Sequence, residues 1–243
     1  MTDAFTFIGR SLRHSVRSVD ALLTAILLPV AIMLLFVYVF GGALQPQGGY
    51  VDYVVPGIIV LCAGFGSAGT AVAVAQDMTT GVVDRFKTLP IAGAAVLTGH
   101  VTASVARNVL STLLVFGVAL LAGFRPTAEP LNWLAAAGLL LALMTAISWL
   151  AACFGLIARS IEAANAITFV AAFAPYLSSA FVPTDTMPDG LAWVAEHQPV
   201  TPIVDTLRAL LLDQPVDHAL AALAWCAAGI LIGRIGAAYL FRR

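Results

Sequence analysis

The chain has 243 residues, of which 60% are hydrophobic and 10% are charged, and its formal net charge at pH 7 is −1. Soluble domains carry about 25% charged residues, so this composition predicts that lipid is the solvent for most of the chain. The near-neutral charge and the single lysine, Lys87, exclude a protein that binds the phosphate backbone of nucleic acids.

Residues 1–20 predict an amphipathic helix that lies along the membrane surface. One side of this helix is apolar, and the other side carries Arg10, Arg13 and Arg17. The arginines would reach the lipid headgroups while the apolar side enters the acyl boundary. From these residues alone we favour a passive anchor over an element that moves with a cytoplasmic partner.

Six segments are long and apolar enough, or nearly so, to cross a bilayer as helices, which takes about 20 residues. They are residues 21–40, 53–76, 101–124, 131–157, 166–182 and 219–241. The fifth is the shortest and contains Pro175. The predicted fold class is an all-α polytopic membrane protein with six transmembrane helices and a single domain over residues 1–243.

The distribution of Lys and Arg predicts the orientation, because cytoplasmic segments of membrane proteins are enriched in these residues. With the N-terminus inside, the cytoplasmic segments hold eight of them: Arg10, Arg13, Arg17, Arg85, Lys87, Arg159, Arg242 and Arg243. The outer loops hold two, Arg125 and Arg208, together with eight acidic residues. Both termini are therefore predicted to be cytoplasmic.

A short helix is predicted at residues 81–90, in the loop between the second and third spans. Its defining residues are Gly81, Val82, Asp84, Arg85, Phe86, Leu89 and Pro90. A helix of one or two turns is unstable alone in water and needs a surface to pack on. That surface is either a groove on a soluble partner or the cytoplasmic ends of the chain's own spans, and the residues leave both open.

Residues 183–218, the loop before the last span, predict two short helices. The first would follow Pro188 and end near His197, and the second would follow Pro202 and end near Leu212. We expect these helices to form a lid over the outer ends of the spans. Whether the lid also gates the release of a substrate is left open by the residues.

Within this lid, three side chains have a predicted role. Asp205 and Arg208 lie three residues apart and could form an ion pair on one helical face. Trp193 suits the membrane interface, where tryptophan is enriched.

The spans contain no machinery for catalysis or for coupling to protons. No Asp or Glu lies in the middle of a span, although ion-coupled transporters usually keep an intramembrane carboxylate. The chain has no phosphate-binding glycine loop, no HExxH, no GxSxG and no metal-ligand cluster. No catalytic residue and no metal site is predicted, and driven transport would need energy from another subunit.

Five segments, in order along the chain, carry a family resemblance. They are PVAIMLLFVYVFGGAL (29–44), DYVVPGIIV (52–60), QDMTTGVVDRFKTLP (76–90), FVPTDTMPDGLAWVAEHQPVTPIVDTLRALL (181–211) and the terminal FRR. Together they resemble the ABC-2 type transporter permeases, and most closely the daunorubicin/doxorubicin-resistance-like exporters. One departure is that many relatives carry Glu before the cytoplasmic loop, where this chain has Gln76 and Asp77.

The resemblance implies a bacterial inner-membrane exporter built from two permease chains of six helices each and two copies of a separate ATPase subunit. The second permease chain would be another copy of this one, and ATP and Mg would be bound by the ATPase, leaving no cofactor on this chain. Residues 81–90 would be the coupling helix seated in the ATPase, flanked by the amphipathic leader. Residues 188–212 would be two outer re-entrant helices that close the exit.

The cargo is predicted from the span composition to be an amphipathic or hydrophobic molecule, drug-like or lipid-like. The candidate lining is aromatic: Phe36, Tyr38, Phe65, Phe169, Phe173 and Tyr176. Each of these could equally be a helix-packing or lipid-facing residue. The alternatives are export of a polysaccharide or glycolipid, a proton-coupled efflux protein and a membrane enzyme of lipid metabolism.

Overall fold

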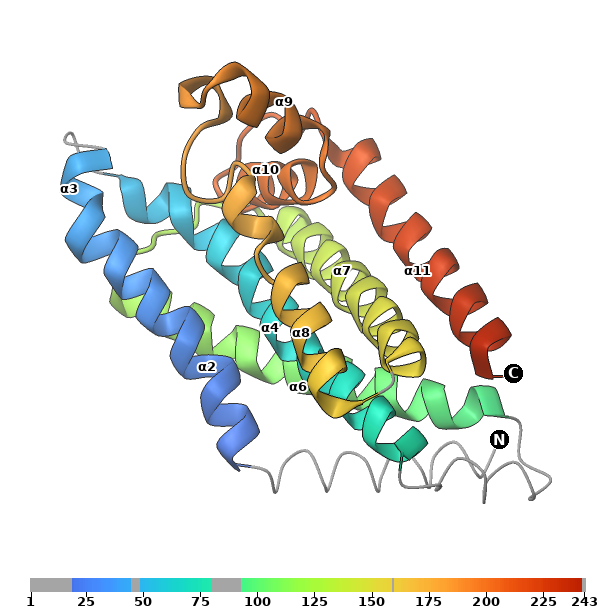
Figure 1. Ribbon diagram of the computed structural model, residues 1–243. Coiled ribbons are helices and arrows are strands. Elements are labelled where there is room, and N and C mark those ends of the chain that lie inside the picture. The colour runs from blue at the N-terminus through green and yellow to red at the C-terminus, as the bar shows by residue number, and fades with distance from the viewer. Residues whose placement is uncertain (1–18, 45–48, 80–92, 159, 242–243) are drawn as a thin grey trace.

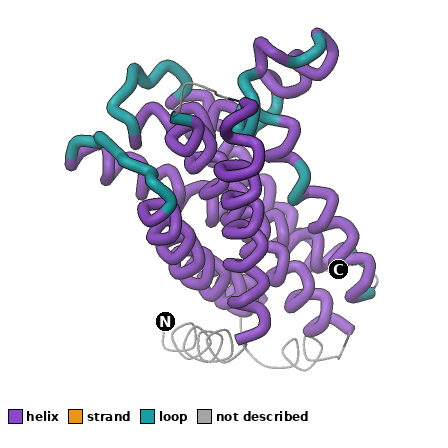
Figure 2. The backbone as a smooth tube through the Cα atoms, turned by 90° about the vertical axis from the view of Figure 1, so that its left-hand side faces the viewer, coloured by secondary structure: helices purple, strands orange, loops and turns teal. Residues whose placement is uncertain are grey.

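The computed structural model describes residues 19–44, 49–79, 93–158 and 160–241, and 84% of the structure is helical. No β-strand occurs within these ranges, as Figure 2 shows. The helices are α2 (Val19–Leu34), the π-helix η1 (Leu35–Phe40), α3 (Gly41–Leu44), α4 (Tyr50–Thr79), α6 (Gly93–Leu121), α7 (Pro130–Ile157), α8 (Ile161–Ala171), the 3₁₀ turns η2 (Ala174–Leu177) and η3 (Thr184–Thr186), α9 (Asp189–His197), α10 (Val200–Leu211) and α11 (Ala219–Phe241). The predicted all-α class is confirmed.

Four helices in the described part of the chain, α4, α6, α7 and α11, are long and apolar enough to cross a membrane. They correspond to the second, third, fourth and sixth predicted spans, and α11 has the predicted bounds, 219–241. The third span is longer than predicted at its start, because α6 begins at Gly93. The first predicted span is divided between α2 and η1, whose apolar stretch is shorter.

The fifth predicted span, 166–182, differs most from the structure. Helix α8 begins at Ile161 and ends at Ala171, and the chain continues through η2 into irregular backbone from Ser178. Pro175 explains this break, because proline has no N–H for the helical ladder and disfavours helical backbone in the residue before it.

Helix α4 lies at the centre of the bundle. It packs against α2, α6, α7, α8 and α10 (Figure 1), and most of its apolar side chains are buried. Helix α11 lies at the edge, packs mainly on α7 and exposes Leu220, Leu231 and Ile235. Exposed apolar side chains on a long helix with so few charges are expected where lipid is the solvent.

Helix α7 approaches two neighbours closely through glycine. A Cβ on Gly155 of α7 would lie 2.5 Å from the backbone oxygen of Ala71 on α4. A Cβ on Gly233 of α11 would lie 2.8 Å from the backbone carbon of Trp149 on α7. Small residues at such contacts bring membrane helices close enough for van der Waals packing to hold them together.

A chain of buried hydroxyls and one amide joins α4, α6 and α7 inside the bundle. The Asn108 amide donates to Ser67 Oγ at 2.7 Å, and Ser148 Oγ donates to Ser104 Oγ at 2.9 Å. Ser67 Oγ and Ser148 Oγ lie 3.4 Å apart, so the two pairs are neighbours inside the bundle. Interhelical hydrogen bonds of this kind contribute about 0.6–2 kcal/mol each in membranes and fix the rotation of each helix.

The short helices α9 and α10 cross one end of the bundle (Figure 1), and the C-terminal end of α11 lies at the other. Helix α9 follows Pro188 and ends at His197, as predicted. Helix α10 begins at Val200, so Pro202 lies inside its first turn and not before it. Proline is tolerated there because the first N–H groups of a helix have no intrahelical acceptor.

Candidate functional site

Helix α10 is amphipathic, and its apolar side packs into the end of the bundle. Ile203, Val204 and Leu207 are buried in the main core, alongside α4 and α7. The opposite side of the helix carries Asp205 and Arg208, which turn toward the start of α4 and the chain that follows η2.

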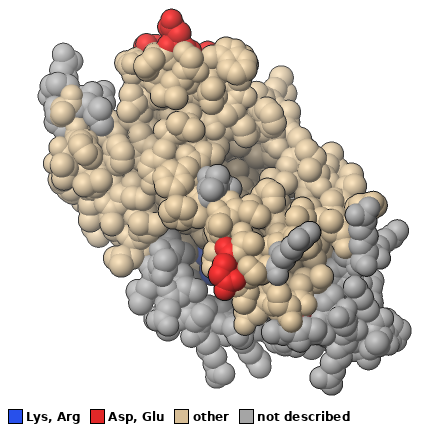
Figure 3. Space-filling model, viewed as in Figure 1, with Lys and Arg blue, Asp and Glu red and all other residues tan. Residues whose placement is uncertain are grey.

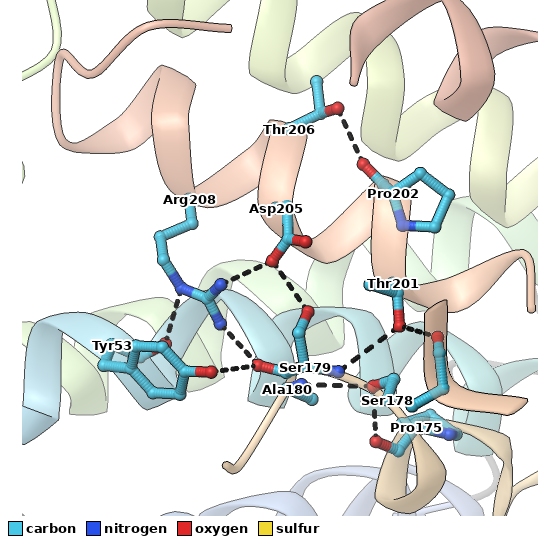
Figure 4. A network of polar contacts seen from close by, with 11 residues as sticks. Tyr53, Pro175, Ser178, Ser179, Ala180, Thr201, Pro202, Asp205, Thr206 and Arg208 are labelled. Atoms are coloured by element: carbon cyan, nitrogen blue, oxygen red, sulfur yellow. Dashed lines mark hydrogen bonds and ion pairs between the residues drawn. The ribbon is translucent and has the colours of Figure 1, made fainter. Parts of the chain in front are cut away.

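The side chains that fasten α10 form a cluster that we name the α10 lock: Tyr53, Ser179, Asp205 and Arg208. Arg208 donates to the Asp205 carboxylate at 2.6 Å, to the backbone oxygen of Ser179 at 2.8 Å and to the backbone oxygen of Tyr53 at 3.1 Å (Figure 4). Its guanidinium carbon lies 3.9 Å from the centre of the Tyr53 ring. The predicted Asp205–Arg208 ion pair is therefore present. Arg208 also joins α10 to α4 and to the chain that follows η2.

The remaining contacts of the α10 lock join its other members to one another. Ser179 Oγ donates to the Asp205 carboxylate at 2.7 Å, and the Tyr53 hydroxyl donates to the backbone oxygen of Ser179 at 2.7 Å. The side chain of Arg208 is 11% exposed and that of Asp205 27% exposed. A guanidinium in such surroundings needs its acceptors, because an unpaired buried charge is strongly unfavourable.

The backbone at residues 178–182 crosses α4 at Gly57. A Cβ on Gly57 would lie 2.6 Å from the Cβ of Ala180, so this crossing requires glycine. The Tyr50 hydroxyl donates to the Phe181 oxygen at 2.8 Å, and Thr201 Oγ1 accepts from the Ser179 N–H at 3.3 Å. The connection from α8 to α9 is thus held against α4 on one side and α10 on the other.

Six aromatic rings follow one another from α8 to η1, and we name them the aromatic row. In order they are Phe169, Phe173, Tyr176, Phe181, Phe36 and Phe40, with successive ring centres 5.1, 5.6, 5.0, 4.4 and 5.5 Å apart. Phe181 is buried, while Phe169 on α8 and Phe173, two residues after the end of that helix, are exposed. The row therefore begins on an exposed surface, and its buried member Phe181 lies two residues from Ser179 of the α10 lock.

Four of the six predicted lining residues belong to the aromatic row: Phe36, Phe169, Phe173 and Tyr176. Phe65 instead packs at the edge of the core on α4. Tyr38 is exposed on η1 and lies outside the row. Phe181, which joins the two halves of the row, and Phe40 were not among the predicted residues.

The predicted lid residues do not all meet. Pro188 precedes the first residue of α9, and Trp193 is exposed there and stacks on His197 with ring centres 4.7 Å apart. Neither takes part in the α10 lock. Tyr53 and Ser179, which do, were not predicted, although the serine pair 178–179, three and four residues after Pro175, was a signal for hydrogen-bonded irregular backbone.

The predicted coupling residues lie outside the described residues: Gly81, Val82, Asp84, Arg85, Phe86, Leu89 and Pro90, and so do Arg10, Arg13 and Arg17 of the leader. On the helices that flank residues 80–92, Asp77 Oδ2 of α4 and His100 Nε2 of α6 form a hydrogen bond at 2.9 Å. Asp77, which precedes the cytoplasmic loop where the resemblance implies a Glu, thus has a hydrogen-bond partner.

No group of three His, Cys, Asp or Glu side chains in the described residues is arranged to hold a metal ion. The α10 lock pairs one carboxylate with one guanidinium, and Ser179 Oγ donates to the same carboxylate. Its contacts hold α10 against α4 and the chain that follows η2.

Comparison with known proteins identifies the family. The model of the ABC-2 type transporter family matches residues 2–212. The daunorubicin resistance ABC transporter permease protein of Streptomyces coeruleorubidus is 27% identical over 215 residues, 85% of this chain and 76% of that protein. The probable doxorubicin resistance ABC transporter permease protein DrrC of Mycobacterium tuberculosis is 24% identical over 243 residues, 97% of this chain and 86% of that protein.

Permeases of this kind are integral membrane subunits that lack the ATPase domain and work with ABC ATPase subunits. The long apolar helices and the match over residues 2–212 agree on one assignment. This chain belongs to the ABC-2 type transporter family.

Proposed function

We propose that this chain is the permease subunit of a bacterial inner-membrane exporter for amphipathic or hydrophobic molecules, drug-like or lipid-like. Two copies would form the pathway by pairing with each other, and two copies of a separate ATPase would bind ATP and Mg and drive alternating access. In this proposal the chain crosses the membrane six times, with α2–η1 and α8–η2 as the shorter crossings and both termini cytoplasmic. Helices α9 and α10 form the outer re-entrant pair.

The observation that carries this proposal is the aromatic row. Its exposed members include Phe169 on α8 and Phe173 just after that helix, and its buried member Phe181 lies two residues from Ser179 of the α10 lock. Aromatic faces offer an apolar or aromatic molecule successive stacking partners at the geometry that proteins favour. Two relatives are named for resistance to daunorubicin and doxorubicin, which are planar aromatic amphiphiles, and we propose cargo of this class.

The α10 lock would be the outer gate in this proposal. Arg208 fastens α10 to both α4 and the backbone after η2, so opening the outer end requires these contacts to break together. A shared cluster of hydrogen bonds opens cooperatively, which suits a gate with two discrete states.

The aromatic row can be tested by export of doxorubicin from cells that express the chain with its ATPase. Removing one ring of an aromatic pair costs about 0.5–1.5 kcal/mol, so Phe173→Ala is expected to raise the KM of export about three- to tenfold. Leu231→Ala, an exposed apolar change on α11 away from the row, is the matched control. Equal KM values for Phe173→Ala and Leu231→Ala would contradict a substrate path along the row.

A further inference from the structure

A second feature lies on another face of α8, away from the aromatic row. A cavity of about 400 Å³ lies between α4, α7, α8, α10 and α11. Its wall there includes Thr168 of α8 and Ala172, which directly follows the helix, whereas the row uses the neighbouring Phe169 and Phe173. Figure 3 shows the surface hollowed in the region between α8 and α11. The volume lies in the range of about 300–1,000 Å³ that small-molecule sites occupy.

The walls of this cavity offer an occupant almost nothing to hydrogen-bond. Two hydroxyl side chains line it, and both hydrogens are already used: Ser67 Oγ donates to the Ala63 oxygen at 2.9 Å and Thr168 Oγ1 to the Ala164 oxygen at 2.9 Å. Ser67 also accepts from Asn108. A polar occupant would lose its hydration without compensation, so the cavity selects an apolar one.

The cavity is elongated along the bundle and opens sideways. Its wall on α7 runs over residues 143–154, which span about 16 Å at the rise of an α-helix, or roughly half of the hydrocarbon core. On α11 its lining residues Trp225 and Ile232 are 44% and 65% exposed, so that side faces lipid. Trp225 lies on the half of α11 nearest α10, where an amphipathic ring suits the approach to the headgroups.

We propose that this cavity binds one acyl chain of a bilayer phospholipid, which enters between α8 and α11 from the leaflet on the α10 side. The apolar walls, the length along the membrane normal and the lateral opening each match a hydrocarbon chain whose headgroup stays outside. The bound chain fills the space beside α8, so the lipid supports the helix whose other face carries the aromatic row. This site does not depend on which molecule the row carries.

The test uses the full-length chain in vesicles of phosphatidylethanolamine and phosphatidylglycerol that contain a phosphatidylethanolamine with a mid-chain diazirine. After illumination, mass spectrometry locates the lipid adducts. For the wild type we expect adducts on cavity-wall residues of α7, such as Ile147 and Leu150, besides those on outward residues such as Leu134.

Gly64 supplies the variant that fills the cavity. It lines the cavity on α4, and a Cβ there would have no neighbour within 4 Å, so Gly64→Leu projects a side chain into the empty space. We expect wall adducts to fall roughly tenfold, the change that about 1.4 kcal/mol of lost binding produces, with outward adducts unchanged. Gly117→Leu on α6, where a Cβ also meets open space but away from the cavity, is the matched control.

Three results would overturn the proposal. The first is wall adducts that persist in Gly64→Leu and in Ala68→Leu, a second filling variant from the same wall. The second is that the cavity wall of the wild type carries no lipid adducts although outward residues are labelled. This result is expected if a second permease chain covers the opening. The third is loss of wall adducts on addition of doxorubicin, which would make the cavity part of the substrate path. Unchanged outward adducts show that each variant is folded.

Discussion

At the scale of single residues, the Arg208 side chain connects several separate parts of the fold. One guanidinium joins α10 to the backbone of α4 and to the backbone after η2. Its partner Asp205 lies three residues away and was predictable from helical spacing. Its contact with Tyr53 was not, because the two residues are 155 positions apart and no local pattern encodes such a distance.

Replacing Arg208 is therefore expected to destabilise the end of the bundle that carries α10. Breaking a buried pair costs about 3–5 kcal/mol, and because Asp205 keeps some solvent contact we expect about 2 kcal/mol for Arg208→Met. Arg208→Lys should lose most of this too, because an ammonium cannot reach three acceptors in the fork geometry of arginine.

Thermal unfolding of the purified chain in detergent measures this loss. The double variant Asp205→Asn/Arg208→Met should be less destabilised than the sum of the single variants, since the two side chains share one network. Glu196→Gln, a change to an exposed acid on α9, should alter stability by less than about 0.5 kcal/mol. Additive single effects would show that the two residues act independently.

At the scale of elements, sequence reasoning succeeded where hydrophobic length alone decides the structure. Helices α7 and α11 match their predicted bounds because both are continuous apolar stretches between polar turns. The fifth span was misjudged because apolar composition continues through Pro175 while the helix does not. The aromatic row also escaped full prediction, since Phe181 lies on irregular backbone whose path depends on Gly57 and Tyr50.

The elements on either side of residues 80–92 suggest how movement of an ATPase would reach the spans. The hydrogen bond between Asp77 and His100 joins the last turn of α4 to the first third of α6. A push on the loop between them would then move both helices together, instead of bending one.

We expect Phe86→Ala, in the predicted coupling helix, to weaken association with the ATPase by about 2 kcal/mol, as loss of an aromatic interface anchor does. Asp77→Asn should leave association with the ATPase unchanged but uncouple ATP hydrolysis from export. Co-purification of the ATPase, stimulated hydrolysis and export distinguish the two outcomes. Normal values of all three for Phe86→Ala would show that this residue only packs on its own chain.

At the scale of the whole molecule, charge and architecture predict one orientation. The acidic loop that contains α9 and α10 lies at one end, and the C-terminal end of α11 lies at the other (Figure 1). The eight-to-two excess of Lys and Arg predicts that the end with the C-terminus is cytoplasmic. The α10 lock would then face the outside, as the proposed exit gate requires.

Single cysteines test this orientation in a variant that lacks Cys62, Cys153 and Cys226. A cysteine at Gln214 should react with a membrane-impermeant thiol reagent in intact cells, and a cysteine at Ser160 should react only after the cells are opened. The reverse pattern would place the α10 lock in the cytoplasm and remove its role as the exit.

The most direct test of the account is transport of doxorubicin in vesicles that contain the permease alone or with its ATPase. With both subunits and Mg-ATP, in the orientation that exposes the ATPase, we expect doxorubicin to accumulate inside and a protonophore to have no effect. The permease alone should transport nothing and bind no nucleotide, because the chain has no phosphate-binding loop. Accumulation driven by a proton gradient, without ATPase or ATP, would contradict the account.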